Sequence, residues 1–372
     1  MSSNMSIRTH ATQPEIQTKV GEITDLTSQT LTLPSGRLLG WAEYGPPTGF
    51  PLIFLHGFPS CRYEGWSLEN IANRKGIRVI CPERPGFGLS TVRPMDSKGV
   101  PKGGFEDLPK LIDYPNDIRA LADHLDLERF SLLGGSGGGP FALACAYSPA
   151  FSAARLHRVG LMASAGPWTI KRPSPIINIV RSYDGKQVDE RELGLNAEKY
   201  LQRNVMYSTY LFYLAVWYFP NFTQRLLNGV VGITRWIMGR QSVKDWLDKR
   251  IERKSSEAPN LSVPRPGDLN TREKIQRTVF TAFDQGAEGA IHEARIGTDE
   301  YGFALSDKTP GIDVKIWHGR KDLNVPVDQI RYLAARIPGC EYWEYDVNHF
   351  GLIKYLGDMM DELIPVEMKG SQ

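Results

Sequence analysis

The sequence predicts an α/β protein with a doubly wound, mostly parallel sheet of eight strands and a helical insertion. Three observations carry this prediction. Apolar runs of strand length recur along the chain, and continuous apolar runs are typical of strands buried on both faces. Helical patterns lie between most of these runs, and such alternation is typical of a parallel sheet. One long stretch without a convincing strand then interrupts the alternation.

The first two expected strands form an antiparallel pair at the beginning of the sheet. A turn signal follows each of them, Pro-Ser-Gly at 34–36 and Gly-Pro-Pro at 45–47. Helical spacing of apolar residues is clearest at 114–125. The expected strands are residues 31–33, 38–44, 51–55, 77–81, 130–133, 159–162, 314–317 and 341–345, and the expected core helices are residues 66–73, 114–125, 140–147, 328–337 and 350–363.

Residues 167–310 are the expected insertion. Aromatic-rich helical patterns occur in it, followed by a further helical pattern at 271–295. Because α/β sheets bind ligands at the carboxyl ends of their strands, we expect the insertion to form a cap or lid over those ends. The predicted organisation is a flexible arm at residues 1–29, a core in two parts at residues 30–166 and 311–372, and the cap between them. The first three helical patterns of the insertion are residues 200–218, 223–238 and 243–253.

Charge, cysteine content and hydropathy limit the classes of function that fit this sequence. Lys and Arg number 44 and Asp and Glu 42, a net charge of +2, which offers no basic stripe for nucleic acid. The four cysteines form no CxxC pair, so we expect no metal and no cofactor. Residues 1–26 lack the apolar core of a signal peptide. The longest apolar stretch, residues 211–219, is far shorter than the ~20 residues of a membrane span. We therefore expect a cytoplasmic protein that acts on a small molecule.

A glycine-rich turn follows the strand expected at 130–133. Residues 134–138 contain G-x-S-x-G between a strand and a helix, which places Ser136 on a sharp turn with its hydroxyl exposed. The backbone N–H of Gly137 can then stabilise an oxyanion. A phosphate-binding loop is the alternative, but Pro140 occupies the third glycine position of G-x-G-x-x-G and no Walker-type motif is present. Ser136 is the predicted nucleophile.

A serine nucleophile needs a base, usually a histidine held by a carboxylate. In this topology the acid and then the histidine each follow a late strand. Asp322 follows the strand expected at 314–317, and His349 follows the strand expected at 341–345. His318 precedes the acid and is expected to be structural. The sequence therefore predicts a triad of Ser136, Asp322 and His349.

The loop after the third expected strand predicts the second oxyanion donor. Its residues are His56, Gly57, Phe58 and Pro59. Gly57 allows a sharp turn, and Pro59 has no N–H to donate. The N–H of Phe58 is therefore the expected donor opposite Gly137, while His56 is expected to hold the turn by hydrogen bonding.

Five motifs in this order resemble the α/β-hydrolase superfamily, over roughly residues 30–363. The resemblance implies the eight-stranded fold, the triad and a variable cap. Two departures stand out, Asn348 where glycine is common and Glu83 where aspartate is common, and we expect them to reshape the pocket edge without removing a catalytic group. The motifs are residues 56–59, 83–90, 134–138, 318–322 and 348–350.

The predicted function is a carboxylesterase-like serine hydrolase that cleaves an ester, thioester or amide of a small, largely apolar substrate through an acyl-enzyme. Aromatic residues of the insertion favour an apolar pocket, with Trp168, Tyr210 and Trp217 as candidate contacts, although an aromatic at helical spacing is more often core. Two alternatives remain: a lyase, cyclase or acyltransferase that uses the same site, and a non-catalytic ligand sensor. An epoxide hydrolase or dehalogenase is disfavoured because those enzymes carry Asp where this chain has Ser136.

Overall fold

The computed structural model describes residues 25–96, 98, 100–104, 107–166, 206–255, 270–299, 301–309 and 311–365, with the side chains of 206–210 and 252–255 excepted. Most of the arm expected at residues 1–29 lies outside these ranges. The chain enters the described part through a turn at 25–28 and continues into the first strand.

Eight strands form one sheet in the order β1-β2-β4-β3-β5-β6-β7-β8. β2 pairs antiparallel with β1 and with β4, and the pairs from β4 through β8 are all parallel. The mostly parallel, eight-stranded sheet with an antiparallel start is therefore confirmed. The strands are β1 (Gln29–Thr32), β2 (Leu38–Tyr44), β3 (Phe50–Leu55), β4 (Ile77–Pro82), β5 (Phe130–Gly135), β6 (Leu156–Met162), β7 (Asp313–Gly319) and β8 (Glu341–Tyr345).

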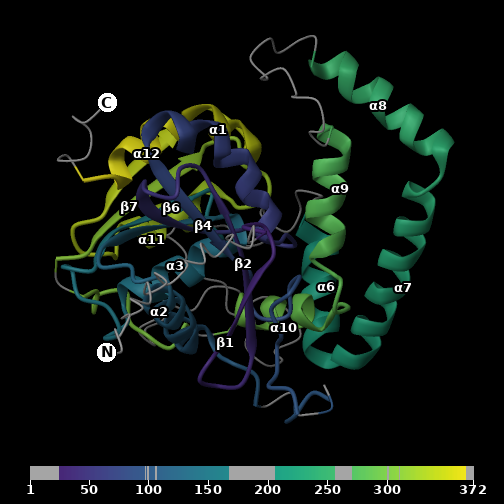
Figure 1. Ribbon diagram of the computed structural model, residues 1–372, viewed down its shortest axis with the longest axis horizontal. Coiled ribbons are helices and arrows are strands. Elements are labelled where there is room, and N and C mark those ends of the chain that lie inside the picture. The colour runs from purple at the N-terminus through teal and green to yellow at the C-terminus, as the bar shows by residue number, and fades with distance from the viewer. Residues whose placement is uncertain are drawn as a thin grey trace, which may run out of the picture.

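Helices cover both faces of the sheet, so the central strands β3 and β5 are buried on both sides, as their mostly apolar sequences predict. One core cluster joins the sheet to α2, α3 and α11, and another joins it to α1 and α12. Figure 1 shows α1 and α12 together at the top and α2 and α3 on the opposite side. The helices are α1 (Trp66–Lys75), α2 (Tyr114–His124), α3 (Gly139–Ala146), α11 (Val327–Ala334) and α12 (Leu356–Leu363).

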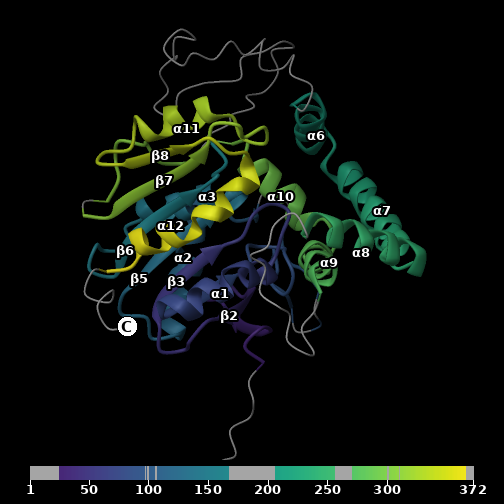
Figure 2. The same ribbon diagram turned by 90° about the horizontal axis from the view of Figure 1, so that it is seen from above.

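Between β6 and β7 the described chain forms helices that lie to one side of the sheet (Figures 1 and 2). The helical pattern at 271–295 is broken in the structure, since α9 ends at Thr281 and α10 begins at Glu288. The chain turns at Gly286, whose φ of +86° suits glycine, and Asn228 accepts the N–H of Ala287 there. The helices are α6 (Met206–Tyr218), α7 (Pro220–Met238), α8 (Gln241–Ser255), α9 (Thr271–Thr281) and α10 (Glu288–Ile296).

Short 3-10 helices follow or precede several of these elements and carry site residues. They are η1 (Arg62–Gly65), η3 (Leu111–Asp113), η4 (Ser136–Gly138) and η5 (His349–Tyr355). Within the described ranges, no helix combines the length and apolar character that crossing a bilayer requires. The same residues contain no cluster of His, Cys, Asp and Glu placed to hold a metal ion.

Candidate active site

Ser136 lies at a sharp turn where β5 ends and η4 begins. Its φ is +49°, a left-handed backbone that a residue with a side chain rarely adopts. The flanking glycines allow the turn because a Cβ on Gly134 would lie 2.6 Å from the carbonyl oxygen of Gly138, and one on Gly138 would lie 2.2 Å from that of Leu55. The turn thus excludes larger residues at both glycine positions of G-x-S-x-G.

The three residues predicted as a triad lie in hydrogen-bonding contact. Nε2 of His349 is 3.1 Å from Oγ of Ser136, and Nδ1 of His349 is 2.7 Å from Oδ2 of Asp322. The Asp322 side chain is fully buried, and that of His349 is 11% exposed. An imidazole held on one side by a carboxylate has its other nitrogen free to accept a proton from the serine hydroxyl.

The carboxylate of Asp322 is fixed by backbone groups. Its Oδ1 accepts the N–H groups of Asn324 at 2.8 Å and Val325 at 2.9 Å, which leaves Oδ2 for His349. His318 lies beside this group, with Nε2 directed to the carbonyl oxygen of Val325 at 2.9 Å. Burial lowers the pKa of His318, which favours a neutral ring that supports the loop through its bond to Val325.

The two residues predicted to donate to an oxyanion, Phe58 and Gly137, lie against each other. A Cβ built on Gly137 would lie 3.2 Å from the backbone nitrogen of Phe58 and 2.6 Å from its Cβ. His56 holds the turn before Phe58, because Nδ1 bonds the carbonyl oxygen of Gly57 at 2.9 Å and Nε2 accepts the N–H of Arg84 at 3.3 Å. Burial holds the pKa of His56 well below its usual value, so a neutral ring serves both bonds.

A buried ion pair beneath this loop was not anticipated from the sequence. Arg84 donates from Nε and Nη2 to the two carboxylate oxygens of Glu293, each at 2.7 Å. Its guanidinium also donates to the carbonyl oxygens of His56 and Gly57. Arg84 is fully buried, and a buried charge of this kind needs such complete pairing. The pair connects α10 to the loop of residues 56–59, which we call the oxyanion loop after its predicted role.

Glu64 is a second residue that the sequence did not single out. Its Oε2 accepts the N–H of Gly57 at 2.9 Å. A Cβ built on Gly57 would lie 3.5 Å both from that oxygen and from Cβ of Ser136, so the carboxyl group and the Ser136 side chain flank the same glycine. Burial raises the pKa of Glu64. The candidate site therefore holds a carboxyl group in addition to that of Asp322.

The active-site cavity has a volume of about 1140 Å³ and contains Ser136 and His349 in its wall. Most of the other lining side chains are apolar, and they come from the core and from the insertion alike. Among the aromatics of α6, Phe212 and Tyr213 line it. The other large apolar residues in the wall are Phe54, Phe58, Leu68, Phe141, Met162, Ile275, Val279, Ile296, Leu323, Val325, Phe350, Leu352, Ile353 and Leu356.

The three aromatic contacts predicted for the substrate have separate outcomes. Trp168 lies outside the described residues, and the side chain of Tyr210 does too, although its backbone is part of α6. Trp217 is not among the residues that line the cavity. Its indole N–H donates to Oγ1 of Thr298 at 2.7 Å, and Arg295 lies over its ring. Trp217 therefore joins α6 to the end of α10.

Neither of the two departures from the family pattern is among the residues that line the cavity. Asn348 caps η5, with its side-chain oxygen accepting the N–H of Gly351 at 2.9 Å. Glu83 is buried and accepts from Arg62 at 2.8 Å and from the N–H of Leu89 at 2.7 Å. Both residues stabilise loops that support the site.

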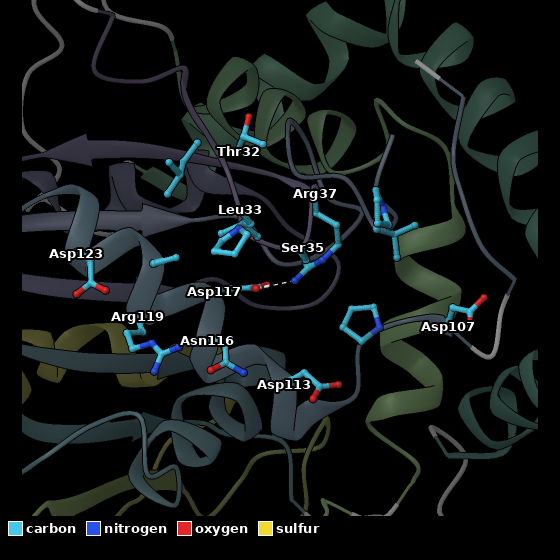
Figure 3. Close-up of a pocket in the computed structure, with 16 residues that line it drawn as sticks. Thr32, Leu33, Ser35, Arg37, Asp107, Asp113, Asn116, Asp117, Arg119 and Asp123 are labelled. Carbon is cyan, nitrogen blue, oxygen red and sulfur yellow. Dashed lines mark hydrogen bonds and ion pairs between the residues drawn. The ribbon is translucent and has the colours of Figure 1, made fainter. Parts of the chain in front are cut away.

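A second cavity of about 720 Å³ lies between the β1–β2 turn and α2 (Figure 3). Arg37 and Asp117 point toward each other in its wall and form an ion pair of 2.6 Å. Asp107 and Asp113 also line it, and each accepts a backbone N–H of its own loop. No residue lines both cavities in the described part of the chain, so this one is separate from Ser136.

The chain matches the model of the alpha/beta hydrolase fold family over residues 51–354. It therefore belongs to that family, in agreement with the motifs and with the sheet. Among solved structures, an epoxide hydrolase from Vigna radiata superposes with a TM-score of 0.55 at 17% identity, and the match covers 92% of this chain and 98% of that one. A likeness at this identity shows the fold alone.

Curated relatives match shorter segments. The chain is 34% identical over 131 residues to the dihydrolipoyllysine-residue acetyltransferase component of the acetoin cleaving system of Pseudomonas putida, covering 35% of this chain and 31% of that protein. It is 27% identical over 182 residues to lipase 3 of Moraxella sp. (strain TA144), covering 47% and 49%. The chain thus spans from 31% to 49% of the length of these two relatives.

Proposed function

We propose that this protein is a serine hydrolase that cleaves an ester, thioester or amide bond of a small, largely apolar substrate. The observation that carries the proposal is the continuous hydrogen-bonded chain from Asp322 through His349 to Ser136, with distances of 2.7 and 3.1 Å. The hydrolase fold and a lipase among the relatives support the same class of reaction.

In the acylation step, Oγ of Ser136 attacks the carbonyl carbon of the substrate while Nε2 of His349 takes its proton. The N–H groups of Phe58 and Gly137 stabilise the oxyanion that forms. Asp322 holds the imidazole in the tautomer that accepts at Nε2 and stabilises its charged form. The bond to the leaving group then breaks, and His349 returns the proton to the alcohol, thiol or amine.

In the deacylation step, His349 takes a proton from water, which attacks the acyl-enzyme carbonyl. The ester bond to Ser136 breaks, the serine regains its proton from His349, and the acid leaves. The apolar wall, with Phe58 from the core and Phe212 from the insertion, favours a largely apolar acyl or leaving group.

The test is labelling by a fluorophosphonate probe, followed by turnover of p-nitrophenyl esters of rising acyl chain length. The wild-type chain should be labelled, and Ser136→Ala should abolish both labelling and turnover. Ser67→Ala is the matched control, because Ser67 also lines the cavity but its hydroxyl donates to the carbonyl oxygen of Glu64. That variant should retain both signals.

Each outcome is decisive for the proposal. Labelling that persists in Ser136→Ala, or a wild-type chain that is never labelled, would reject the serine nucleophile and favour a ligand sensor on the same fold. Labelling that depends on Ser136 without release of acid from any ester, thioester or amide would reject hydrolysis. It would instead favour a lyase, cyclase or acyltransferase that uses the same residues.

A further inference from the structure

The outer face of α7 carries a continuous apolar stripe. Phe222, Ile233 and Trp236 are 67%, 61% and 62% exposed. Residues spaced by three and four positions lie on one side of a helix. These side chains therefore form a single band along most of α7, a 19-residue helix that is about 28 Å long. The exposed members of the stripe are Phe222, Leu226, Val230, Ile233, Trp236 and Ile237.

A different side of α7 attaches it to the protein. Leu227 and Val231 pack against a core cluster that includes Phe87 and Phe283, and Arg235 donates to the carbonyl oxygen of Phe280 on α9. In Figures 1 and 2, α7 lies on the far side of α9 from the sheet. A Cβ on Gly229 or Gly232 would meet nothing within 4 Å. The stripe is therefore exposed on the outer side of α7 in the described part of the chain.

Basic side chains accompany the stripe. The segment from Pro220 to Ser255 holds eight Lys and Arg residues and three Asp and Glu residues, a net charge of +5 in a chain whose net charge is +2. α7 itself has no acidic residue. Arg240 lies over the ring of Trp236, with 3.9 Å from its guanidinium carbon to the ring centroid, and Arg250 lies over the exposed Trp246 at 5.3 Å.

We propose that the α7–α8 surface docks on an anionic lipid bilayer. An amphipathic helix with tryptophan and aliphatic residues on one face and flanking Lys and Arg fits the bilayer interface, where rings and aliphatic groups enter the acyl boundary and cations meet lipid phosphates. A second copy of the chain would bring the same +5 segments together, and the resulting repulsion makes it the poorer occupant.

Two residues of α9 relate the active-site cavity to this docking surface. Ile275 and Val279 of α9 line the cavity wall and are also exposed, with 54% and 40% of their surface accessible. α9 packs beside α8, where Arg272 pairs with Asp248 at 2.8 Å. α9 therefore carries apolar side chains that line the cavity and are also open to solvent, next to α8 of the proposed docking surface. An apolar substrate dissolved in a bilayer would reach the cavity along this helix.

The test is flotation of the full chain with vesicles of phosphatidylcholine alone and of phosphatidylcholine with phosphatidylserine at about 7:3. Binding to the anionic vesicles should be tighter and should weaken as salt is added. The double variant Leu226→Gln, Ile233→Gln should lower that binding by about tenfold or more. Ile112→Gln is the matched control, because Ile112 is exposed on η3, outside the α7–α8 surface.

The contribution of basic residues to binding is tested by the double variant Arg240→Gln, Lys249→Gln, which should bind less tightly to the anionic vesicles only. Lys354→Gln is the control. Ser136→Ala should bind vesicles like the wild type, so failure of the docking and failure of the hydrolase proposal remain distinguishable. Wild-type chain that stays unbound would overturn the proposal. A wild-type dimer in analytical ultracentrifugation that the double variant Leu226→Gln, Ile233→Gln dissociates would also overturn it. So would a lowered Tm of that double variant, because it would show that another segment of the same chain packs on the stripe.

Discussion

Arg84 and Glu293, 209 residues apart in the chain, form a two-bond ion pair directly below the oxyanion loop. Arg84 follows β4, and Glu293 lies in α10 of the insertion. Because Arg84 also donates to the carbonyl oxygens of His56 and Gly57, the pair fixes the loop that presents the N–H of Phe58. α10 is thus tied to the loop after β3 by charge as well as by packing.

The first prediction concerns this pair. Glu293→Gln leaves the buried guanidinium of Arg84 without a counter-charge, and breaking a buried pair from one side costs about 3–5 kcal/mol. We expect a loss of that size in the free energy of unfolding measured by urea denaturation. Glu288→Gln is the control, since Glu288 pairs with Arg93 in a more exposed position and should lose only about 0–1 kcal/mol. Similar losses in both variants would contradict the prediction.

The sheet could be predicted from the sequence because a short apolar or alternating stretch indicates each strand locally. The strands expected at 38–44 and 341–345 match β2 and β8 residue for residue, and the apolar run at 51–55 misses only the first residue of β3. The helical pattern at 271–295 failed for a local reason as well, since one glycine at 286 in a left-handed conformation turns the chain between α9 and α10.

The site was only partly predictable. Ser136, Asp322 and His349 stand in motifs whose order carries information, and the structure brings them together. Glu64 and Glu293 stand in no motif. Their importance depends on contacts with Gly57 and Arg84 that the fold creates, and no spacing in the chain indicates such a partner. Long-range pairs of this kind become visible only in three dimensions.

The second prediction separates two glycines of the elbow. Gly137→Ala would place a Cβ 2.6 Å from Cβ of Phe58, so the oxyanion loop must move. We expect kcat to fall by about 10²–10³, the loss typical of a removed oxyanion donor. Gly135→Ala is the matched control, because its Cβ would meet only side-chain atoms at ordinary contact distance, the ring of Phe54 at 3.4 Å and Cε of Met162 at 3.6 Å. Its kcat should stay within about tenfold of wild type, and equal losses would contradict the assignment.

The third prediction concerns the acid. Asp322→Asn keeps a side-chain oxygen for the N–H groups of Asn324 and Val325, which the carboxylate now accepts. The amide cannot stabilise a charged imidazole and can favour the wrong tautomer of His349, so we expect kcat to fall by about 10⁴ with the fold retained. Steady-state kinetics with a p-nitrophenyl ester measures the loss, and circular dichroism checks the fold. Asp346→Asn is the control. Asp346 forms an exposed ion pair with Lys321, and its substitution should leave kcat unchanged.

The last prediction is a dependence of stability on pH that arises outside the active site. His292 of α10 is buried, and Nε2 donates to the carbonyl oxygen of Pro109 at 2.8 Å. Burial lowers the pKa of His292 to about 4, whereas an unfolded histidine titrates near ~6.5. Between these values the unfolded chain binds the additional proton, so the free energy of unfolding falls as pH decreases from ~6.5 to 4, by about 3 kcal/mol from this group. His292→Gln retains a donor for Pro109 and removes the titration. Urea denaturation from pH 7 to 4 should therefore give a shallower decline in the variant, and parallel curves for the two chains would show that His292 does not carry the effect.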